Sequence, residues 1–219
     1  VMVSYTVSGL DGKISSTTHK KVAQQIGTYN SSYYYGPVTW MTISTALPVG
    51  VEDMLKGMKV GGTRKAVVPA WLMGYDRYNN PDKYLQKSTD ESNTIYTITL
   101  EGVSTDILKS QVDSMQIYSA LHMNKTDSTS YGFYYQQLKE PADTHSFKAD
   151  TSIYINYTGR LLNGQVFDTT IADTAKVHNI YSSSNTYSPV KITWGKSYTD
   201  LTMTASGSSS SSSIISGFK

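Results

Sequence analysis

Alternating apolar positions predict several strands that each bury one face. Four segments place apolar or aromatic side chains at every second position, which is the period of a half-buried strand. These positions are Val1, Val3 and Tyr5; Tyr96, Ile98 and Leu100; Ile153, Ile155 and Tyr157; and Val190, Ile192 and Trp194.

Two segments carry a helical period instead. Val51, Met54, Leu55 and Met58 stand at i, i+3, i+4 and i+7, so a short amphipathic helix is expected there, ending near Gly61-Gly62. A second helix, read as a linker, is expected over residues 104–124; its apolar positions are Ile107, Leu108, Val112, Met115 and Leu121. Antiparallel strands with few helices predict the α+β class.

One skeleton occurs twice along the chain. Tyr5-Thr6, Asp11-Gly12, Thr17-Thr18 and Pro37-Val38 each return 152 positions later, as Tyr157-Thr158, Asn163-Gly164, Thr169-Thr170 and Pro189-Val190. The Asp-Gly and Asn-Gly pairs predict tight hairpin turns. Gly50-Val51 then corresponds to Gly217-Phe218, which leaves 15 extra residues in the second copy. The serine run 208–213 falls among them and is expected to be a flexible loop.

Composition narrows the classes of function. The chain has 219 residues, a net charge of +2 and no cysteine, so disulfides and thiolate chemistry are excluded within it. No basic stripe supports nucleic-acid binding. No apolar run approaches the roughly 20 residues of a membrane helix, so no span is expected. The four histidines are scattered, without a metal-ligand spacing.

The segment Tyr157-Thr158-Gly159 to Phe167-Asp168-Thr169-Thr170 resembles the signature of FKBP-type peptidyl-prolyl isomerases. Pro189-Val190-Lys191-Ile192 and Ile214-Ile215-Ser216-Gly217-Phe218 extend the resemblance, and Val60 to Pro69 resembles the family's strand ending in Ile-Pro. The chain is therefore interpreted as tandem FKBP-like modules, residues 1–103 and 125–219, each an antiparallel twisted sheet wrapped on a short helix.

The resemblance implies a site in the second module that acts on proline-containing polypeptides without a cofactor or a metal. It gives Tyr157, Phe167, Asp168 and the Ile215 N–H catalytic roles. It implies an apolar pocket whose walls are Tyr157, Phe167, Val190, Ile214, Ile215 and Phe218. Phe218 stands where the family usually has Trp. Taken from spacing alone, Tyr157 and Phe167 are more simply core aromatics, and Asp168 is more simply a turn residue.

The first module departs from the family pattern. Ser15-Ser16 replaces Phe-Asp, Pro48 has no N–H where Ile215 would donate one, and Val51 replaces the aromatic at the pocket floor. Leu72-Met73-Gly74-Tyr75 scrambles the family's Ala-Tyr-Gly element. This module is therefore expected to be a scaffold or a binding domain.

The repeat also indicates missing pieces. The first module lacks its opening strand, and the second lacks a counterpart to residues 52–103, so the protein is expected to extend at both ends or to draw the missing half from another chain. Tandem modules preceded by a strand such as Gly132-Phe133-Tyr134-Tyr135 resemble Gram-negative envelope lipoproteins of the Bacteroidetes type. That resemblance implies a periplasmic location, with any export signal or lipid anchor upstream of Val1.

Two classes of function remain open at this point. One is a prolyl isomerase and folding chaperone for exported proteins. The other is a noncatalytic binding or structural module of the cell envelope, favoured by the eroded first copy and the 18 tyrosines. Tyr33-Tyr34-Tyr35 fits either a sugar-stacking surface or, more simply, an exposed aromatic loop.

Overall fold

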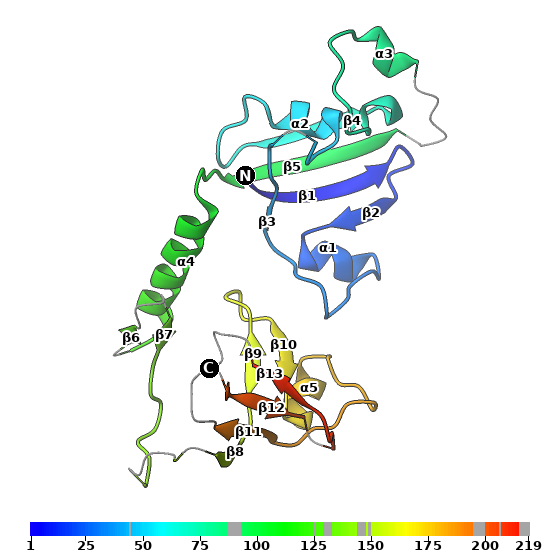
Figure 1. Cartoon of the computed structure of the whole chain (residues 1–219). Helices are drawn as coiled ribbons and strands as arrows, with labels where there is room; N and C mark the ends of the chain where they lie inside the picture. Colours follow the sequence, from blue (N-terminus) through cyan, green and yellow to red (C-terminus); the bar gives the residue numbers. More distant parts are fainter. Residues whose placement is uncertain are drawn as a thin grey trace. The chain divides into compact units, whose positions relative to one another are not determined.

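A computed structural model describes residues 1–43, 45–86, 93–124, 126–128, 133–143, 148, 150–194, 200–205 and 207–214. These residues form an α+β structure whose sheets are antiparallel (Figure 1). The chain divides into two compact units, a first unit of Val1–Asp106 and a second unit of Ile107–Lys219.

The first unit is built on one five-stranded sheet. Its path is β2-β1-β5-β4, with β3 also paired to β1, so β1 is the central strand. In chain order the elements are β1 (Met2–Gly9), β2 (Ile14–Thr17), α1 (Lys20–Gln25), β3 (Val38–Thr39), α2 (Val49–Leu55), β4 (Thr63–Val68), the 3-10 helix η1 (Ala70–Leu72), α3 (Asp82–Leu85) and β5 (Thr94–Gly102).

Helix α2 packs on one face of this sheet and closes the core of the first unit. Its Val51 and Met54 side chains are buried in a cluster with strand residues from β1, β4 and β5: Val3, Val68, Ile98 and Leu100. Val3 and Ile98 have no exposed surface. The predicted strands at these positions are therefore confirmed, and their apolar faces meet under α2.

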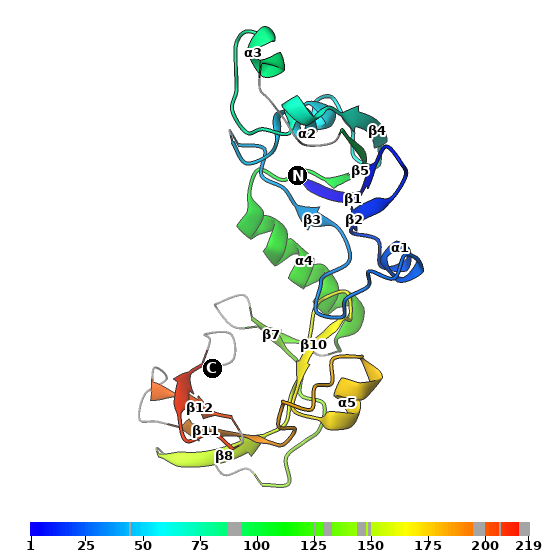
Figure 2. The same cartoon turned by 90° about the vertical axis from the view of Figure 1, so that its right-hand side faces the viewer.

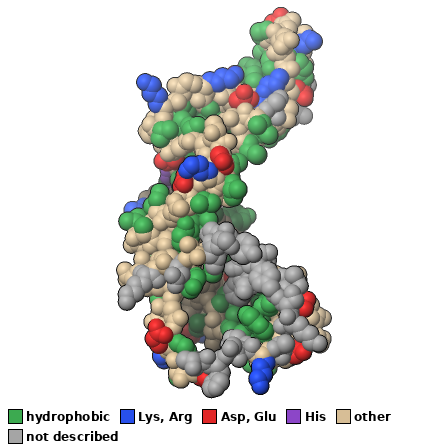
Figure 3. All heavy atoms as spheres, turned by 60° about the vertical axis from the view of Figure 1, so that its left-hand side comes forward, with side chains coloured by type: hydrophobic (Ala, Val, Ile, Leu, Met, Phe, Trp, Pro, Cys, Tyr) green, Lys and Arg blue, Asp and Glu red, His purple; other side chains and the backbone are tan. Residues whose placement is uncertain are grey.

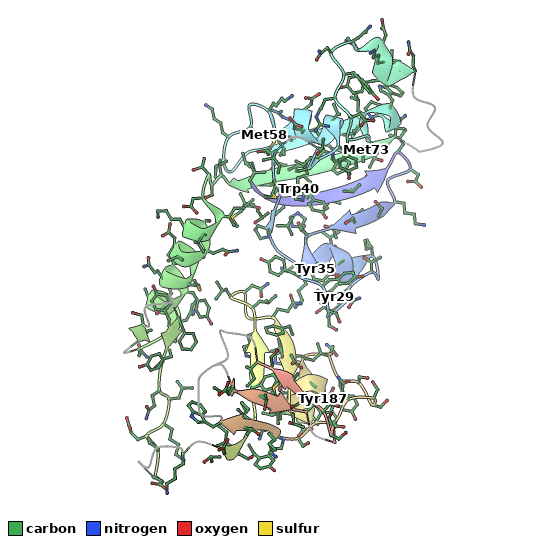
Figure 4. All side chains as sticks on the ribbon, viewed as in Figure 1. Tyr29, Tyr35, Trp40, Met58, Met73 and Tyr187 are labelled. Atoms are coloured by element: carbon green, nitrogen blue, oxygen red, sulfur yellow. The ribbon has the colours of Figure 1, made fainter. Side chains whose placement is uncertain are left out.

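Helix α2 is shorter than the sequence pattern predicts. It ends at Leu55, because Lys56 is extended (φ −60°, ψ 127°) and Gly57 takes a left-handed φ of 72°. Met58 therefore lies beyond the helix, where it still packs against the core (Figure 4). The apolar period through Met58 therefore indicates a partly buried side chain, although Met58 is not part of the helix.

The second unit begins with the long helix α4 and contains smaller sheets. A helix was predicted at this place in the chain, and α4 spans Ile107–His122. The further elements are β6 (Asp127–Ser128), β7 (Tyr134–Tyr135), β8 (Thr151–Ile155), β9 (Thr158–Arg160), β10 (Val166–Thr169), α5 (Ala172–Val177), β11 (Val190–Trp194), β12 (Thr202–Thr204) and β13 (Ser211–Ser213).

The main sheet of the second unit has the order β13-β12-β11-β8, and β9 and β10 form a separate hairpin. Ile192, Leu201 and Ile214 make its buried cluster. The predicted opening strand around Tyr134 is not part of this sheet, because β7 pairs with β6 in a two-stranded ribbon. Gly132, the first residue of that prediction, lies outside the described residues.

The serine run is not only a loop. Ser211–Ser213 forms β13, which pairs antiparallel with β12 through Thr202↔Ser213 and Thr204↔Ser211. All three serines are exposed. The loop prediction rested on the serine content alone. Backbone hydrogen bonds to β12 override the low strand propensity of serine in this segment.

The two copies of the repeated skeleton fold in the same register. Val3 faces Val38 as Ile155 faces Val190. Both Gly12 (φ 81°) and Gly164 (φ 84°) close their hairpins in the left-handed region, as the Asp-Gly and Asn-Gly pairs predict. Helix α1 then follows β2 as α5 follows β10 (Figure 2). The repeat in the sequence is therefore a repeat in structure over this part of each unit.

Charged side chains of both signs occur on the surface. On the face drawn in Figure 3, Lys and Arg side chains are interspersed with Asp and Glu. Within the described parts of the chain, no helix is both long enough and apolar enough to cross a bilayer.

Candidate functional site in the β9–β10 hairpin

The β9–β10 hairpin carries three of the predicted site residues and contains a bulge. Arg160 faces Val166 and Gly159 faces Asp168, so Phe167 between them has no opposite partner. An extra residue of this kind bends a strand and re-aims its neighbours. In a regular strand, the side chains of Phe167 and Asp168 would point to opposite faces. The bulge changes the directions of both side chains from that alternation.

Threonine hydroxyls fix the base of the hairpin. The backbone N–H of Tyr157 donates to Oγ1 of Thr170 over 3.0 Å, and the N–H of Thr170 donates to the Tyr157 carbonyl over 3.1 Å. The hydroxyls of Thr158 and Thr169 lie 2.9 Å apart across the strands. Thr169 and Thr170 are buried, so these bonds are shielded from water and hold Tyr157 in place.

Tyr157 and Asp168 form the polar pair of the site. The phenol of Tyr157 donates to Oδ2 of Asp168 over 2.6 Å, a length expected for a hydroxyl bound to a carboxylate. Partial burial and then this carboxylate raise the pKa of Tyr157 to about 12. The phenol therefore stays protonated at neutral pH, with its one proton directed at Asp168.

Phe167 provides an exposed aromatic surface beside this pair. Its side chain is 57% exposed, although one part of the ring lies against the backbone of Gly159. The resemblance placed this residue at the wall of an apolar pocket. The structure places its ring at the surface of the hairpin, where a ligand can reach it.

The structure places Val190 and Ile214 in the sheet interior, away from the surface. Val190 faces Ile155 across β11 and β8, and Ile214 packs with Ile192 and Leu201. The two are 7% and 6% exposed. Ile215 and Phe218 lie outside the described residues, so the role given to the Ile215 N–H stays a prediction.

The matching hairpin of the first unit has no such pair. Ser15 and Ser16 stand at the positions of Phe167 and Asp168, in the same register against β1. Tyr5, the counterpart of Tyr157, packs on Trp40 with ring centroids 5.1 Å apart. Pro48 immediately precedes α2 and offers no N–H.

A pair of stacked tyrosines occurs in both units and was missed by the sequence reasoning. Tyr29 stacks on Tyr35 with ring centroids 5.3 Å apart (Figure 4). Tyr181 stacks on Tyr187 with ring centroids 5.1 Å apart. The signal was present, since both tyrosines obey the same offset of 152 residues. Tyr33, by contrast, is 63% exposed, as the exposed-loop interpretation expects.

The first unit also contains a groove that none of the predicted site residues lines. It has a volume of about 280 Å³ and lies between α2 and β4, bordered by Met54, Val68 and Leu72. Arg64 on its wall donates to the carbonyls of Met54 and Lys56, which satisfies the end of α2. The position of the Arg64 side chain is therefore accounted for by helix capping.

Two comparisons bear on the identity of the chain. Neither the protein-family models nor the curated proteins contain a match to it. Among the described residues there is also no cluster of three or more His, Cys, Asp or Glu side chains that could hold a metal ion.

Proposed function

We propose that the second unit is a prolyl isomerase, which accelerates cis–trans isomerisation of Xaa-Pro bonds in polypeptides without a cofactor. The observation that carries the proposal is the contact between Tyr157 and Asp168 beside the exposed ring of Phe167. Its natural substrates would be exported proteins that fold slowly because of proline.

The chemistry needs no nucleophile and no proton transfer. The barrier of roughly 20 kcal/mol comes from amide resonance, so uncatalysed isomerisation takes tens of seconds. An enzyme lowers it by binding the twisted amide more tightly than either planar form. A fixed apolar surface with few hydrogen-bonding groups meets that requirement.

The residues of the hairpin divide this work between them. The exposed ring of Phe167 offers a flat surface on which a proline ring can pack. The proton of Tyr157 is held by Asp168, so the pair presents acceptor atoms only and suits an N–H of the bound peptide. A donor for the peptide carbonyl must come from elsewhere, and the backbone of Ile215 is our candidate.

The test is the rate of isomerisation of a short Xaa-Pro peptide, followed by exchange NMR with the whole chain. We expect Phe167→Ala and Asp168→Ala each to reduce the acceleration about ten-fold or more, because each removes a contact to the twisted peptide. Tyr154→Ala is the matched control, since Tyr154 is an exposed aromatic of the same unit on β8. Wild-type rates equal to those in buffer would reject the isomerase.

A noncatalytic binding role is the second candidate, and the first unit favours it. Ser15 and Ser16 remove the aromatic and the carboxylate, yet Tyr5, Trp40 and Tyr96 still pack half-buried beside the core. Burial, followed by the nearby Tyr5 and Tyr75, raises the pKa of Tyr96. Quenching of Trp40 fluorescence by unfolded, proline-free polypeptide, in a chain with Trp71 and Trp194 replaced by Phe, would support binding; an unchanged signal would oppose it.

A further inference from the structure

The two repeated hairpins differ by an exchange of side-chain size at two positions. Gly159 and Phe167 in the second unit correspond to Val7 and Ser15 in the first. Both hairpins have the same cross-strand pairs and the same bulge, so the two positions are equivalent in space as well as in sequence. The second unit thus pairs a glycine with an aromatic ring, whereas the first unit pairs valine with serine, both smaller than phenylalanine.

The ring of Phe167 occupies the space that a side chain at position 159 would need. A Cβ atom there would lie 2.6 Å from Cζ, 2.8 Å from Cε2 and 3.1 Å from Cε1 of Phe167. If this Cβ lay in the plane of the ring beyond Cζ, it would be farther from both Cε atoms than these distances allow. It would therefore lie over the face of the ring, and the α-hydrogen of Gly159 that takes the place of this Cβ points at that face. Covering a strand glycine with a cross-strand aromatic is a known way of stabilising it.

Space is the reason for a glycine at this position. Gly159 is not among the glycines with a positive φ, so its backbone conformation is open to any residue. In the first unit Val7 fills the same place and is 8% exposed, while Ser15 turns its hydroxyl to the Val7 carbonyl over 3.3 Å. A ring at position 15 would collide with Val7, as a side chain at 159 would collide with Phe167.

We infer that these two positions form one exchangeable packing pair, and that Gly159 is the positioning residue for Phe167. With glycine at position 159, the bulge of the second unit has room for an aromatic ring beside Asp168. With valine at the equivalent position 7, the bulge of the first unit does not. The pair therefore decides which unit offers a flat surface to a proline ring, and this last consequence rests on the proposed function.

The packing pair is tested by a double-mutant cycle on the whole chain. The variants are Gly159→Val, Phe167→Ser and the double variant, which recreates the pairing of Val7 with Ser15. Hydrogen exchange of residues 158–169 measures how easily the hairpin opens. We expect Gly159→Val alone to raise opening about ten-fold or more, and the double variant to return to within about three-fold of Phe167→Ser.

Two further variants secure the cycle. Gly159→Ala makes the same collision with less volume, in case the valine variant does not fold. Gly74→Ala is the matched control, because Gly74 has open space around it and no positive φ, and it should leave exchange unchanged. In the wild type, an α-proton of Gly159 should also be shifted upfield by the ring, and Phe167→Ser should abolish the shift. The packing pair would be overturned if the effects of Gly159→Val and Phe167→Ser on the exchange rate were additive. It would also be overturned if the α-protons of Gly159 had ordinary chemical shifts in the wild type.

The isomerase assay separates this inference from the proposed function. We expect the double variant to be folded and to have lost the acceleration. The positioning role of Gly159 is tested by Gly159→Ala, which keeps Phe167: a folded Gly159→Ala variant that is as fast as the wild type would overturn that role. If the wild type itself gives no acceleration, the proposed function fails, and the exchange cycle alone then decides whether the packing pair stands.

Discussion

The phenol of Tyr157 carries its only proton toward Asp168, and this contact sets the polarity of the candidate site. A carboxylate that already accepts this bond keeps further acceptor capacity, and the phenol oxygen adds more. At the scale of single residues the site is therefore anionic and accepting. Groups of this kind can accept a backbone N–H, which is the contact that the proposed function requires of them.

The ionisation of Tyr157 follows from its surroundings. Because its pKa of about 12 exceeds the usual value of about 10, the protonated phenol stabilises the fold fully below pH about 10. That contribution is lost as the pH rises through about 12. NMR titration of tyrosines labelled at Cζ, assigned with Tyr157→Phe, should find this late-titrating group. Asp168→Asn should lower its pKa only in part, because burial is the larger cause; a titration near 10 in the wild type would contradict the contact.

Thr170 offers a second prediction at this scale, which concerns stability. Its Oγ1 accepts the N–H of Tyr157 and donates to Oδ1 of Asn156 over 3.0 Å. Thr170→Val keeps the shape but removes the acceptor of a partly buried N–H, so we expect a loss of about 1–3 kcal/mol in the free energy of unfolding.

Thr18→Val should cost the first unit a similar amount, because Thr18 accepts the N–H of Tyr5 over 2.8 Å. Thr63→Val is the control, since its hydroxyl bond to Thr99 is exposed, and it should change little. Denaturant unfolding measures all three. Equal effects at buried and exposed sites would argue against the hydroxyls as anchors.

At the scale of elements, each short helix with its following loop is closed by the tyrosine stack. The hydroxyl of Tyr35 accepts the N–H of Asn30 over 3.0 Å, and that of Tyr187 accepts the N–H of Ser182 over 2.9 Å. A lysine ammonium lies over the first ring in both cases, Lys20 above Tyr29 and Lys176 above Tyr181. Helices α1 and α5 each have only one buried residue, Ala23 and Ala175. The stacked tyrosines therefore supply much of the packing that holds each helix and its loop together.

Removing one hydroxyl tests this view of the loops. Tyr35→Phe and Tyr187→Phe keep the stack but free one backbone N–H, so the exchange rate of Asn30 or Ser182 should rise about five-fold or more. Tyr33→Phe is the control on an exposed neighbour. Unchanged exchange at Asn30 and Ser182 would mean that stacking alone closes the loops.

The sequence predicts these elements unevenly, for physical reasons. Strands with a period of two and the two glycine turns follow from local chemistry, and they agree with the structure. The end of α2 and the strand Ser211–Ser213 do not, because Lys56, Gly57 and the partner strand β12 decide them. The contact of Phe167 with Gly159 depends on a bulge, which no periodicity reveals.

At the scale of the molecule, each compact unit has its own buried cluster. The cluster under α2 draws only on the first unit, and Ile192, Leu201 and Ile214 belong to the second. The repeat predicts the common plan as far as Val38 and Val190. Beyond them, the sheet of the first unit adds β4 and β5, whereas that of the second unit adds β12 and β13. Sequence comparison within the chain thus locates the shared part and cannot supply the strand order of the rest.

Separate cores lead to a prediction about unfolding. Ile98→Ala removes a side chain with no exposed surface, so the first unit should lose about 2–5 kcal/mol of stability. Hydrogen exchange in residues 190–194 of the second unit should stay as in the wild type. Ile192→Ala is the reciprocal variant. Loss of protection in both units from either substitution would indicate one cooperative structure.

The strand of serines at the border of the second unit's sheet bears on how the protein behaves at high concentration. In the sheet of described residues, β13 is terminal, and its Ser211–Ser213 side chains are exposed. An edge of this kind invites edge-to-edge pairing between molecules when it is long and apolar. Strand β13 is only three residues long, and its serine side chains are polar. It pairs with β12 within its own sheet, but it offers little apolar surface for pairing with a strand of another molecule.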